Sequence, residues 1–472
     1  MDTSRALNLC YSAAGDLRFQ HFTLIAPAKT ADGLDLRALM AILLGVALAS
    51  LDTAIANTAL PAIAADLQAS PAASIWVINA YQLAIVATLL PFAALGDLLG
   101  PRRVFLAGLA FFTIASLGCA FASTLPALAV ARALQGIGAS GVMSVNIALI
   151  RLIFPASRLG RGVGLNALVV GVSFALGPTV ASLILSVASW PWLFAINVPL
   201  GMLALGFALP ALPRAATRGH GFDWLSAVLT ALSFAALVLA LGAAAQREPP
   251  SMALTALGVA VLAAALLLWR QAGHPAPMLP VDLLRRPLFA LSAITSMASF
   301  TTQGLAFVAL PFYFEEVLQR NPIETGFLMT PWPIVVALAA PIAGRLSDRY
   351  PPGLLGGFGL LLLSSGLVSF ALLTSHPSTT VIVLCMALCG VGFGLFQAPN
   401  MKALMSSAPT ERSGGASGVI AMARLLGQTT GAALVALCFG LAGARGPVLA
   451  LGLAAGFAAL ASVTSFARLW TR

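Results

Sequence analysis

The chain has 472 residues, of which 60% are hydrophobic and 8% are charged, and its mean hydropathy is +0.97. Soluble domains carry about 25% charged residues, so this chain has too few charges to cover a surface that faces water. The composition therefore excludes an ordinary soluble protein. The net charge of +10 comes from basic residues spread singly along the chain, which favours an orientation signal in a membrane over nucleic-acid binding.

Fourteen apolar stretches follow one another between residues 38 and 467. Each is close to the roughly 20 residues that cross a bilayer as a helix. The stretches are continuous rather than alternating, so they predict helices and exclude a membrane barrel of strands. The predicted spans are approximately 38–59, 74–95, 104–122, 126–150, 163–187, 193–212, 223–244, 252–269, 288–314, 326–344, 354–374, 380–401, 416–440 and 447–467.

The basic residues divide unequally between the two sides of this topology. With both termini in the cytoplasm, 20 of the 25 Lys and Arg residues fall on the cytoplasmic side, 3 on the outer side and 2 within spans. The positive-inside rule requires such an excess in cytoplasmic loops. Residues 1–37 contain no long apolar core before Leu39, so we expect no cleavable signal peptide and interpret them as a disordered cytoplasmic tail.

A residue pattern repeats along the chain at an offset of 254 residues. The repeat predicts two parallel six-helix halves, at 38–212 and 288–472, separated by two inserted spans and linkers at 213–287. Transporters built from such parallel repeats bind substrate near the middle of the membrane, between the halves. The recurring residues are Pro155, Arg158, Gly160 and Gly164, which return as Pro409, Arg412, Gly414 and Gly418.

Four motifs, in order and on the expected sides of the membrane, support a family resemblance. They are Leu51–Pro61 (LDTAIANTALP), Ala93–Arg103 (AALGDLLGPRR), Arg132–Ala139 (RALQGIGA) and Trp190–Gly201 (WPWLFAINVPLG). With these motifs the chain resembles the major facilitator superfamily, and in particular its fourteen-span drug:proton antiporters of the EmrB/QacA type. The second motif departs from the family pattern at Ala93 and Leu98, and its copy in the second half, Gly344–Arg349 (GRLSDR), fits better.

The resemblance implies an all-α integral membrane protein of the major facilitator fold, in a bacterial cytoplasmic (inner) membrane. It implies a proton-coupled exporter of lipophilic small molecules, expected to be cations, and no enzyme. We expect the proton gradient as energy source and no cofactor, because the chain has no nucleotide-binding Gly-rich loop ending in Lys-Ser or Lys-Thr. The expected partners are the substrate, protons and membrane lipid, with no nucleic acid; some relatives also work with a periplasmic adaptor and an outer-membrane channel. The alternatives are an exporter of a specific metabolite and a proton-coupled uptake symporter on the same fold.

One carboxylate, Asp52, lies well inside an apolar span. A charge at this depth is costly, and burial favours the neutral, protonated acid. Such a group can bind a proton in exchange for an organic cation; the alternative is a structural Asp that bonds a neighbouring helix. Arg132 is the matching buried cation, for which the resemblance suggests a role in proton coupling and a structural pin is the alternative. Arg424 matches a family Arg and is interpreted as structural.

Further residues are assigned by motif and position. Asp97, Arg102, Arg103, Asp348 and Arg349 lie at cytoplasmic ends of spans and are interpreted as conformational gate residues, with solvated loop charges as the alternative. Gly171, Gly177 and Pro178 resemble part of the antiporter motif, although its final pair of glycines is replaced by Ala181 and Ser182. No metal site is expected. Residues that could line a substrate cavity are Asn57, Tyr81, Gln82, Asn166, Gln303, Phe307, Gln397 and Asn400.

Overall fold

The computed structural model describes residues 35–155, 158–214, 223–245, 249–272, 283, 285–373, 377–407 and 413–470, and within these ranges every regular element is a helix. The predicted N-terminal tail lies outside the described residues, apart from its last three positions. Proline stands in the first turn of many helices, for example α5 (Pro101–Ala120), where its missing N–H leaves no hydrogen bond unmade.

The first half of the chain forms six spans. These are α2 (Leu36–Asp66), the pair α3 (Pro71–Ser74) and α4 (Trp76–Leu99), α5, α6 (Leu125–Ile153), α7 (Leu159–Leu185), and the pair α8 (Pro191–Ala195) and α9 (Asn197–Ala211). We call the end at which α2 begins the basic end, because it carries Arg102, Arg103, Arg151, Arg286 and Arg345, and the other the opposite end.

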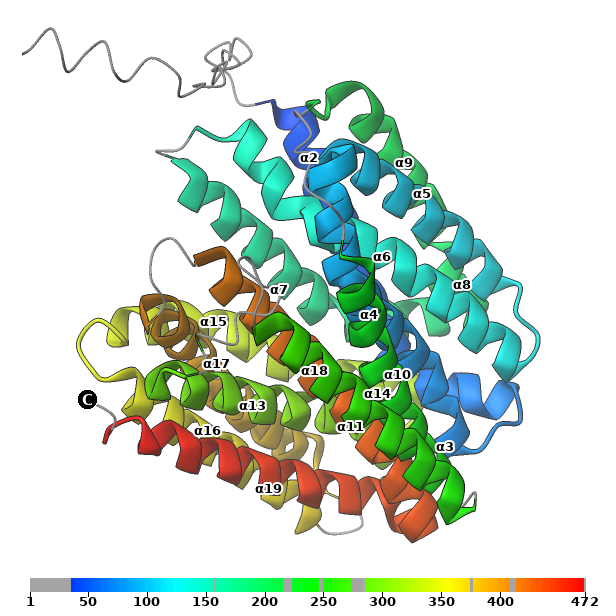
Figure 1. The fold of residues 1–472 in the computed structure, drawn as a ribbon. Coiled ribbons are helices and arrows are strands. Elements are labelled where there is room, and N and C mark those ends of the chain that lie inside the picture. Colours follow the sequence, from blue (N-terminus) through cyan, green and yellow to red (C-terminus); the bar gives the residue numbers. More distant parts are fainter. Residues whose placement is uncertain are drawn as a thin grey trace, which may run out of the picture. The chain divides into compact units, whose positions relative to one another are not determined.

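The last part of the chain forms a second set of helices, which lies beside the first in Figure 1. Its elements are α13 (Pro287–Phe312) with the π-helix η2 (Tyr313–Val317), α14 (Pro322–Met329) with α15 (Pro331–Leu346), α16 (Pro352–Ala371), α17 (Thr379–Ser407), α18 (Ser413–Ala442) and α19 (Gly446–Ala467).

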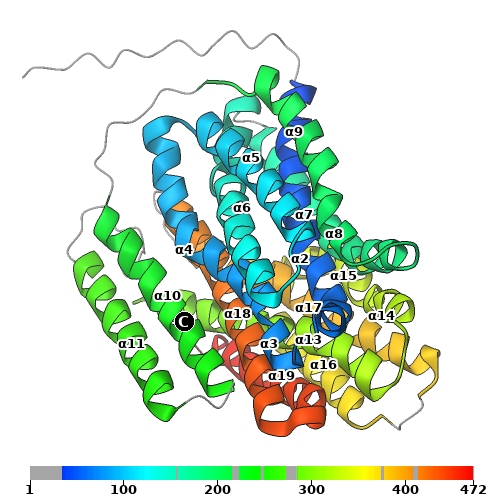
Figure 2. The ribbon, with the colours of Figure 1, turned by 90° about the vertical axis from the view of Figure 1, so that its right-hand side faces the viewer.

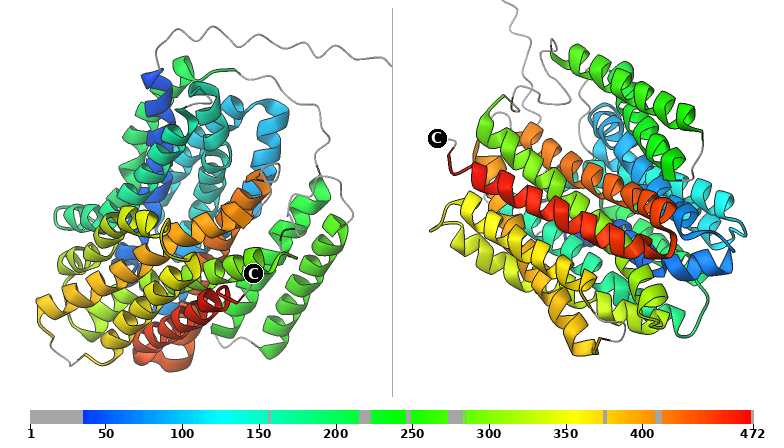
Figure 3. Two further views of the ribbon diagram at one scale, coloured as in Figure 1. Left: turned by 90° about the vertical axis from the view of Figure 1, so that its left-hand side faces the viewer. Right: turned by 90° about the horizontal axis from the view of Figure 1, so that it is seen from below.

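Two further helices, α10 (Trp224–Ala245) and α11 (Pro250–Ala272), form a hairpin between these halves in the sequence. Helix α10 packs against both α4 and α18, so it contacts each half. Helix α11 packs against α10 on the side that faces away from the two halves (Figures 2 and 3). Arg270 Nη2 lies 3.0 Å from Asp223 Oδ1 and ties the ends of the hairpin together. Partial burial raises the pKa of Asp223, but hydrogen bonds from Ser226 and Arg270 outweigh it and lower the pKa to about 2. Asp223 therefore stays ionised at physiological pH.

Thirteen stretches of the described residues are long and apolar enough to cross a membrane. Twelve of them coincide with one predicted span each. The thirteenth, Val419–Ala467, contains both α18 and α19, which are separated by the short 3-10 turn η4 (Gly443–Arg445). The count therefore differs from the predicted fourteen at this pair of helices only.

Glycines at corresponding helix contacts of the two halves make equivalent close approaches. A Cβ atom on Gly108 of α5 would lie 2.8 Å from the carbonyl oxygen of Gly138 on α6. In the second half, a Cβ atom on Gly359 of α16 would lie 2.6 Å from the carbonyl oxygen of Gly392 on α17. Small residues at both contacts let the helix backbones touch, as is usual where membrane helices pack.

The two halves are in contact from the middle of the helix bundle to the opposite end. Hydrogen bonds that join them include Thr429 to Gln82 at 3.2 Å and Thr179 to Thr330 at 2.8 Å. Near the opposite end, a Cβ atom on Gly326 of α14 would collide with Ser182 of α7. Figure 1 shows the helices of the two halves diverging towards the basic end.

Candidate functional site

A buried ion pair lies inside the first half. Arg132 Nη1 of α6 is 2.5 Å from Asp52 Oδ2 of α2, and both side chains are only 1% exposed. The other carboxylate oxygen of Asp52 accepts hydrogen bonds from Asn197 Nδ2 at 2.8 Å and from Gln135 Nε2 at 2.9 Å. Asp52 thus connects α2 with α6 and α9.

Arg132 has a full set of partners as well. Its Nε donates to the carbonyl oxygen of Val77 at 3.1 Å, and its Nη1 also donates to Gln135 Oε1 at 2.5 Å. The guanidinium carbon lies 4.1 Å from the centre of the Tyr81 ring and 5.4 Å from that of Phe194, within cation–π range. The ion pair is therefore enclosed by protein groups, as a buried pair must be to offset its desolvation.

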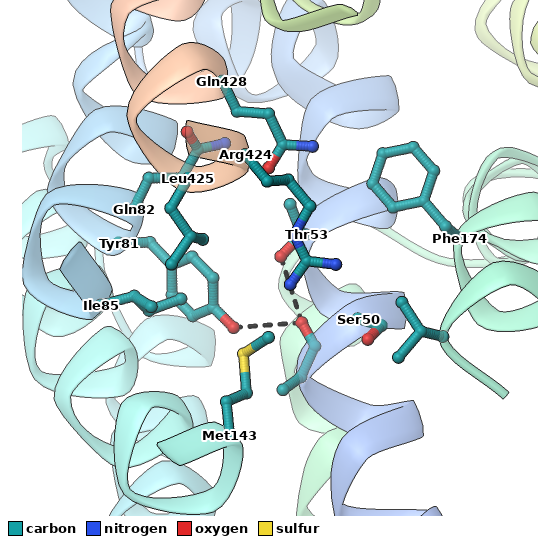
Figure 4. A pocket seen from close by; sticks show the side chains of 12 residues that line it. Ser50, Thr53, Tyr81, Gln82, Ile85, Met143, Phe174, Arg424, Leu425 and Gln428 are labelled. Atoms are coloured by element: carbon teal, nitrogen blue, oxygen red, sulfur yellow. Dashed lines mark hydrogen bonds between the residues drawn. The ribbon is translucent and has the colours of Figure 1, made fainter. Parts of the chain in front are cut away.

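A pocket with a cavity volume of about 60 Å³ lies beside this ion pair, between the halves. Figure 4 shows Ser50 and Thr53 of α2 on one side, Tyr81 and Gln82 of α4 on another, and Arg424 reaching in from α18. The residues that line it are Ala49, Ser50, Thr53, Tyr81, Gln82, Ile85, Met143, Val170, Phe174, Arg424, Leu425 and Gln428.

A second, smaller pocket, with a cavity volume of about 10 Å³, adjoins the first and shares Thr53, Gln82, Phe174 and Gln428 with it. Aromatic side chains pack beside it: the Phe174 and Phe307 rings are 5.2 Å apart, and the Phe307 and Trp332 rings 5.1 Å apart. Because Phe174 belongs to the first half and Phe307 to the second, this packing crosses the interface. The residues that line the second pocket are Thr53, Asn57, Gln82, Phe174, Gln303, Gly304, Phe307, Val308 and Gln428.

The predicted cavity residues divide into two groups. Tyr81 and Gln82 line the first pocket, and Asn57, Gln82, Gln303 and Phe307 line the second.

The other three line neither pocket. Asn166 accepts a hydrogen bond from Asn146 at 3.2 Å, whereas Asn400 bonds Ser296 and Arg468 between helices of the second half. Gln397 is half-buried.

The predicted gate residues all lie at the basic end, but their surroundings differ. Asp348 pairs with Lys402 at 2.5 Å, and Arg102 donates to the carbonyl oxygen of Leu209 at 2.6 Å. Arg103, Arg349 and Asp97 are exposed, and Asp97 has no ion-pair partner among the residues that the structure describes. Each of these bonds stays within one half, so none of them bridges the halves in this conformation.

The residues of the antiporter motif have unequal surroundings on α7. Gly177 is buried against α2, where an added Cβ would collide with that of Ala54. Pro178 is also buried, and its carbonyl oxygen lies next to Gly326 of the second half. Gly171 is exposed, with no atom within 4 Å of the position that a Cβ would take.

We therefore expect Gly177→Ala to impair the protein and Gly171→Ala to leave it unchanged. The extra methyl at Gly177 forces α2 and α7 apart, and overpacking of this kind typically costs about 1–3 kcal/mol. Since Ala54 is two residues from Asp52, the shift also reaches the ion pair. Thermal unfolding in detergent and dye export from cells measure the effect, and equal tolerance of the two substitutions would contradict this packing argument.

Sequence profiles decide the family. The profile described as "Major Facilitator Superfamily" matches residues 42–432 and, in a second match, residues 292–471. The chain belongs to the major facilitator superfamily. It is accordingly a multi-pass membrane transporter and not an enzyme, as the sequence predicted.

Relatives within the superfamily differ in what is known of them. The chain is 50% identical over 449 residues to the "Uncharacterized transporter YebQ" of Escherichia coli (strain K12), covering 94% of this chain and 98% of that one. It is 31% identical to the "Riboflavin transporter RibZ" of Clostridioides difficile (strain 630), covering 85% and 87%. It is also 31% identical to the "Tetracenomycin C resistance and export protein" of Streptomyces glaucescens, covering 87% and 77%.

Solved structures agree on the fold. A bacterial homologue of the human lysosomal transporter Spinster, in an inward-facing and unoccupied conformation, superimposes with a TM-score of 0.68 at 14% identity. The alignment covers 93% of this chain and 98% of that one. The predicted major facilitator fold is therefore confirmed.

Several site residues of this superfamily member were not singled out from its sequence. Gln135 and Asn197 donate hydrogen bonds to Asp52, and they lie inside the motifs Arg132–Ala139 and Trp190–Gly201, which carry the family resemblance. Polar residues within spans are the signal that could have found them, because such residues face the bundle interior. Thr53 lies inside the motif Leu51–Pro61 and Phe174 between Gly171 and Gly177 of the antiporter motif, whereas Gln428 lines the pockets without any motif to mark it.

Proposed function

We propose that this member of the superfamily is a proton-driven exporter of lipophilic small molecules, of the fourteen-span drug:proton antiporter type. The observation that carries the proposal is the buried Asp52–Arg132 pair next to a pocket between the halves. The name of the tetracenomycin relative supports export. The name of the riboflavin relative favours a second candidate, transport of one specific metabolite, with uptake as its direction still open.

The link from proton to substrate runs through α2. Asp52 points into the first half, whereas its neighbours Ser50 and Thr53 line the pocket. Protonation removes the charge that holds Arg132 and weakens the hydrogen bonds from Asn197 and Gln135. The contacts that hold α2 against α6 and α9 are then weaker, so the face of α2 that carries Ser50 and Thr53 can shift.

Tyr81 is a second link between the ion pair and the pocket. Its ring lies over Arg132 at 4.1 Å, and the same side chain lines the first pocket. Its hydroxyl group donates to the carbonyl oxygen of Ala49 on α2 at 3.1 Å. A substrate that displaces Tyr81 therefore acts on both Arg132 and α2.

The proposed cycle alternates access between the two sides of the membrane. A proton from outside reaches Asp52 when the opposite end is open, and the substrate leaves there. The protein then closes its opposite end, releases the proton into the cytoplasm and binds substrate again. Cooperation with a periplasmic adaptor and an outer-membrane channel stays a prediction from the resemblance.

The expectation of a cationic substrate has no support from the pockets. Asp52 lines neither of them, and no carboxylate occurs among the described residues that do. A cation would therefore find no counter-charge there.

Dye efflux from proteoliposomes tests the proposed function. The purified protein is reconstituted with either of two dyes inside, the permanent anion 8-anilinonaphthalene-1-sulfonate (ANS) or the permanent cation rhodamine 6G. We expect an acidic outer buffer to drive efflux of at least one dye, and a protonophore to stop it. Efflux that is indifferent to the pH gradient, or equal to that from protein-free liposomes for both dyes, would contradict proton-driven export.

A further inference from the structure

The pocket between the halves carries one formal charge among its described residues, and that charge is positive. Arg424 of α18 is partly buried and reaches into the pocket towards α2 (Figure 4). It has no hydrogen bond or ion pair within the part of the chain that the structure describes. Asp52, the nearby buried acid, is already neutralised by Arg132. An unpaired guanidinium in such a site is costly, and an anion would offset that cost.

The contrast between the buried Arg132 and the partly buried Arg424 is informative. Arg132 has a carboxylate, an amide oxygen, a backbone carbonyl and two aromatic faces around it. Arg424 has none of these among described residues, although it lies on the wall of the same interface. A structural pin would be bonded like Arg132, so the interpretation of Arg424 as structural is not supported by its surroundings.

A second polar group in the pockets is also unsatisfied. Asn57 of α2 is 4% exposed, its Oδ1 has no hydrogen-bond donor among the described residues, and its side chain lines the second pocket. Buried acceptors of this kind are normally bonded, so each exception asks for an explanation. A hydroxyl or N–H group on a bound molecule would supply the missing donor.

The rest of the lining is neutral and partly aromatic. Phe174 and Phe307 pack against each other beside the second pocket, and Gln303 and Gln428 are bonded to each other at 2.9 Å. Apolar walls with a few placed polar groups are typical of sites for small organic molecules. Together they provide a cationic end at Arg424 and an aromatic end at Phe174 and Phe307.

We propose that this transporter binds aromatic organic anions, with a carboxylate or sulfonate group paired to Arg424 and the ring system against Phe174 and Phe307. A planar guanidinium fits the two oxygens of such a group. Asn57 accepts a hydrogen bond from a donor on the same molecule. This substrate class deepens the proposed function and rests on the pocket being the transport site.

Equilibrium dialysis of the purified full chain in detergent tests the substrate class without any proton gradient. The probes are ANS and rhodamine 6G, and protein-free detergent is the blank. We expect the wild type to bind ANS, and Arg424→Gln to weaken this binding about 10- to 100-fold, as expected for the loss of a charge-assisted hydrogen bond. Arg424→Lys keeps the positive charge but loses the planar guanidinium group. Its affinity for ANS should therefore lie between those of the wild type and Arg424→Gln. Arg445→Gln, an equal loss of charge at the exposed turn η4, should not change binding.

Thermal unfolding separates binding from folding. Because Arg424 has no partner to lose, Arg424→Gln should unfold at the same temperature as the wild type or higher, and saturating ANS should stabilise the wild type but not the variant. Preference for rhodamine 6G, unchanged ANS binding in Arg424→Gln, or no binding of either dye would overturn the proposal. If the pH gradient drove efflux of rhodamine 6G but not of ANS, proton-driven export would still be supported and the proposal of anionic substrates would be refuted.

Discussion

Asp52→Asn is expected to abolish transport driven by a pH gradient while leaving exchange of substrate across the membrane intact. Asn has nearly the shape of Asp but cannot bind and release a proton. It can still accept hydrogen bonds from Asn197 and Gln135, which hold Asp52 at 2.8 and 2.9 Å. The substitution therefore removes the titration more than the packing.

The cost to folding is limited by the surroundings of Arg132. Removing one partner of a buried ion pair typically costs about 3–5 kcal/mol, because the other charge is left unpaired. Arg132 keeps Gln135, the carbonyl oxygen of Val77 and the ring of Tyr81. The variant should be less stable than the wild type but still folded, and gel filtration and thermal unfolding in detergent check this.

Two assays on proteoliposomes measure the effect. Accumulation of ANS or rhodamine 6G against its gradient, with a pH difference, should fall to the protein-free level in Asp52→Asn. Exchange of external for internal dye at equal pH should stay within a few-fold of wild type. Asp66→Asn is the matched control: it is the same change on the same helix, at a carboxylate that accepts a hydrogen bond from Trp190 at 2.7 Å near the opposite end.

Two results would contradict the coupling role. Gradient-driven accumulation by Asp52→Asn at the wild-type rate would show that another group carries the proton. If a folded Asp52→Asn variant lost both dye exchange and dye accumulation, the role of Asp52 would be structural, which is the alternative to proton coupling.

The fold was predictable because its signals are long and repeated. Twenty-residue apolar stretches, an excess of basic residues on one side and a repeat at 254 residues each report on many positions at once. The predicted helix starts fall within four residues of the observed ones, whereas the predicted ends of α2 and α17, at 59 and 401, fall short of Asp66 and Ser407. Where the count of spans differs, at α18 and α19, only the turn Gly443–Arg445 separates two apolar helices, so hydropathy alone divides them poorly.

The site was less predictable, because it depends on which face of each helix a polar residue occupies. Asp52 and Thr53 are adjacent in sequence, yet one is enclosed within the first half and the other lines the pocket. The sequence showed two buried arginines within spans but could not show that Arg132 has a carboxylate partner and Arg424 has none. That difference changes the expected charge of the substrate.

Export of an anion in exchange for a proton has an electrical consequence that export of a cation lacks. Moving one ANS anion out and one proton in transfers two positive charges inward. Moving one rhodamine 6G cation out for one proton in transfers none. Each charge is worth about 2.3 kcal/mol per 100 mV. An inside-negative potential of this size therefore adds about 4.6 kcal/mol to ANS export, or roughly a 2,000-fold change in the limiting concentration ratio.

Proteoliposomes clamped with valinomycin and potassium measure this dependence. We expect ANS efflux by the wild type to rise with an inside-negative potential at constant pH, and the null potential to shift with the pH difference as two transferred charges require. A passive leak of ANS moves one charge only and is insensitive to Arg424→Gln, so the slope and the variant together distinguish transport from leakage. Efflux of ANS that is independent of potential would refute anion–proton exchange. A steeper slope would instead report more than one proton per anion, since every further proton adds one charge to the cycle.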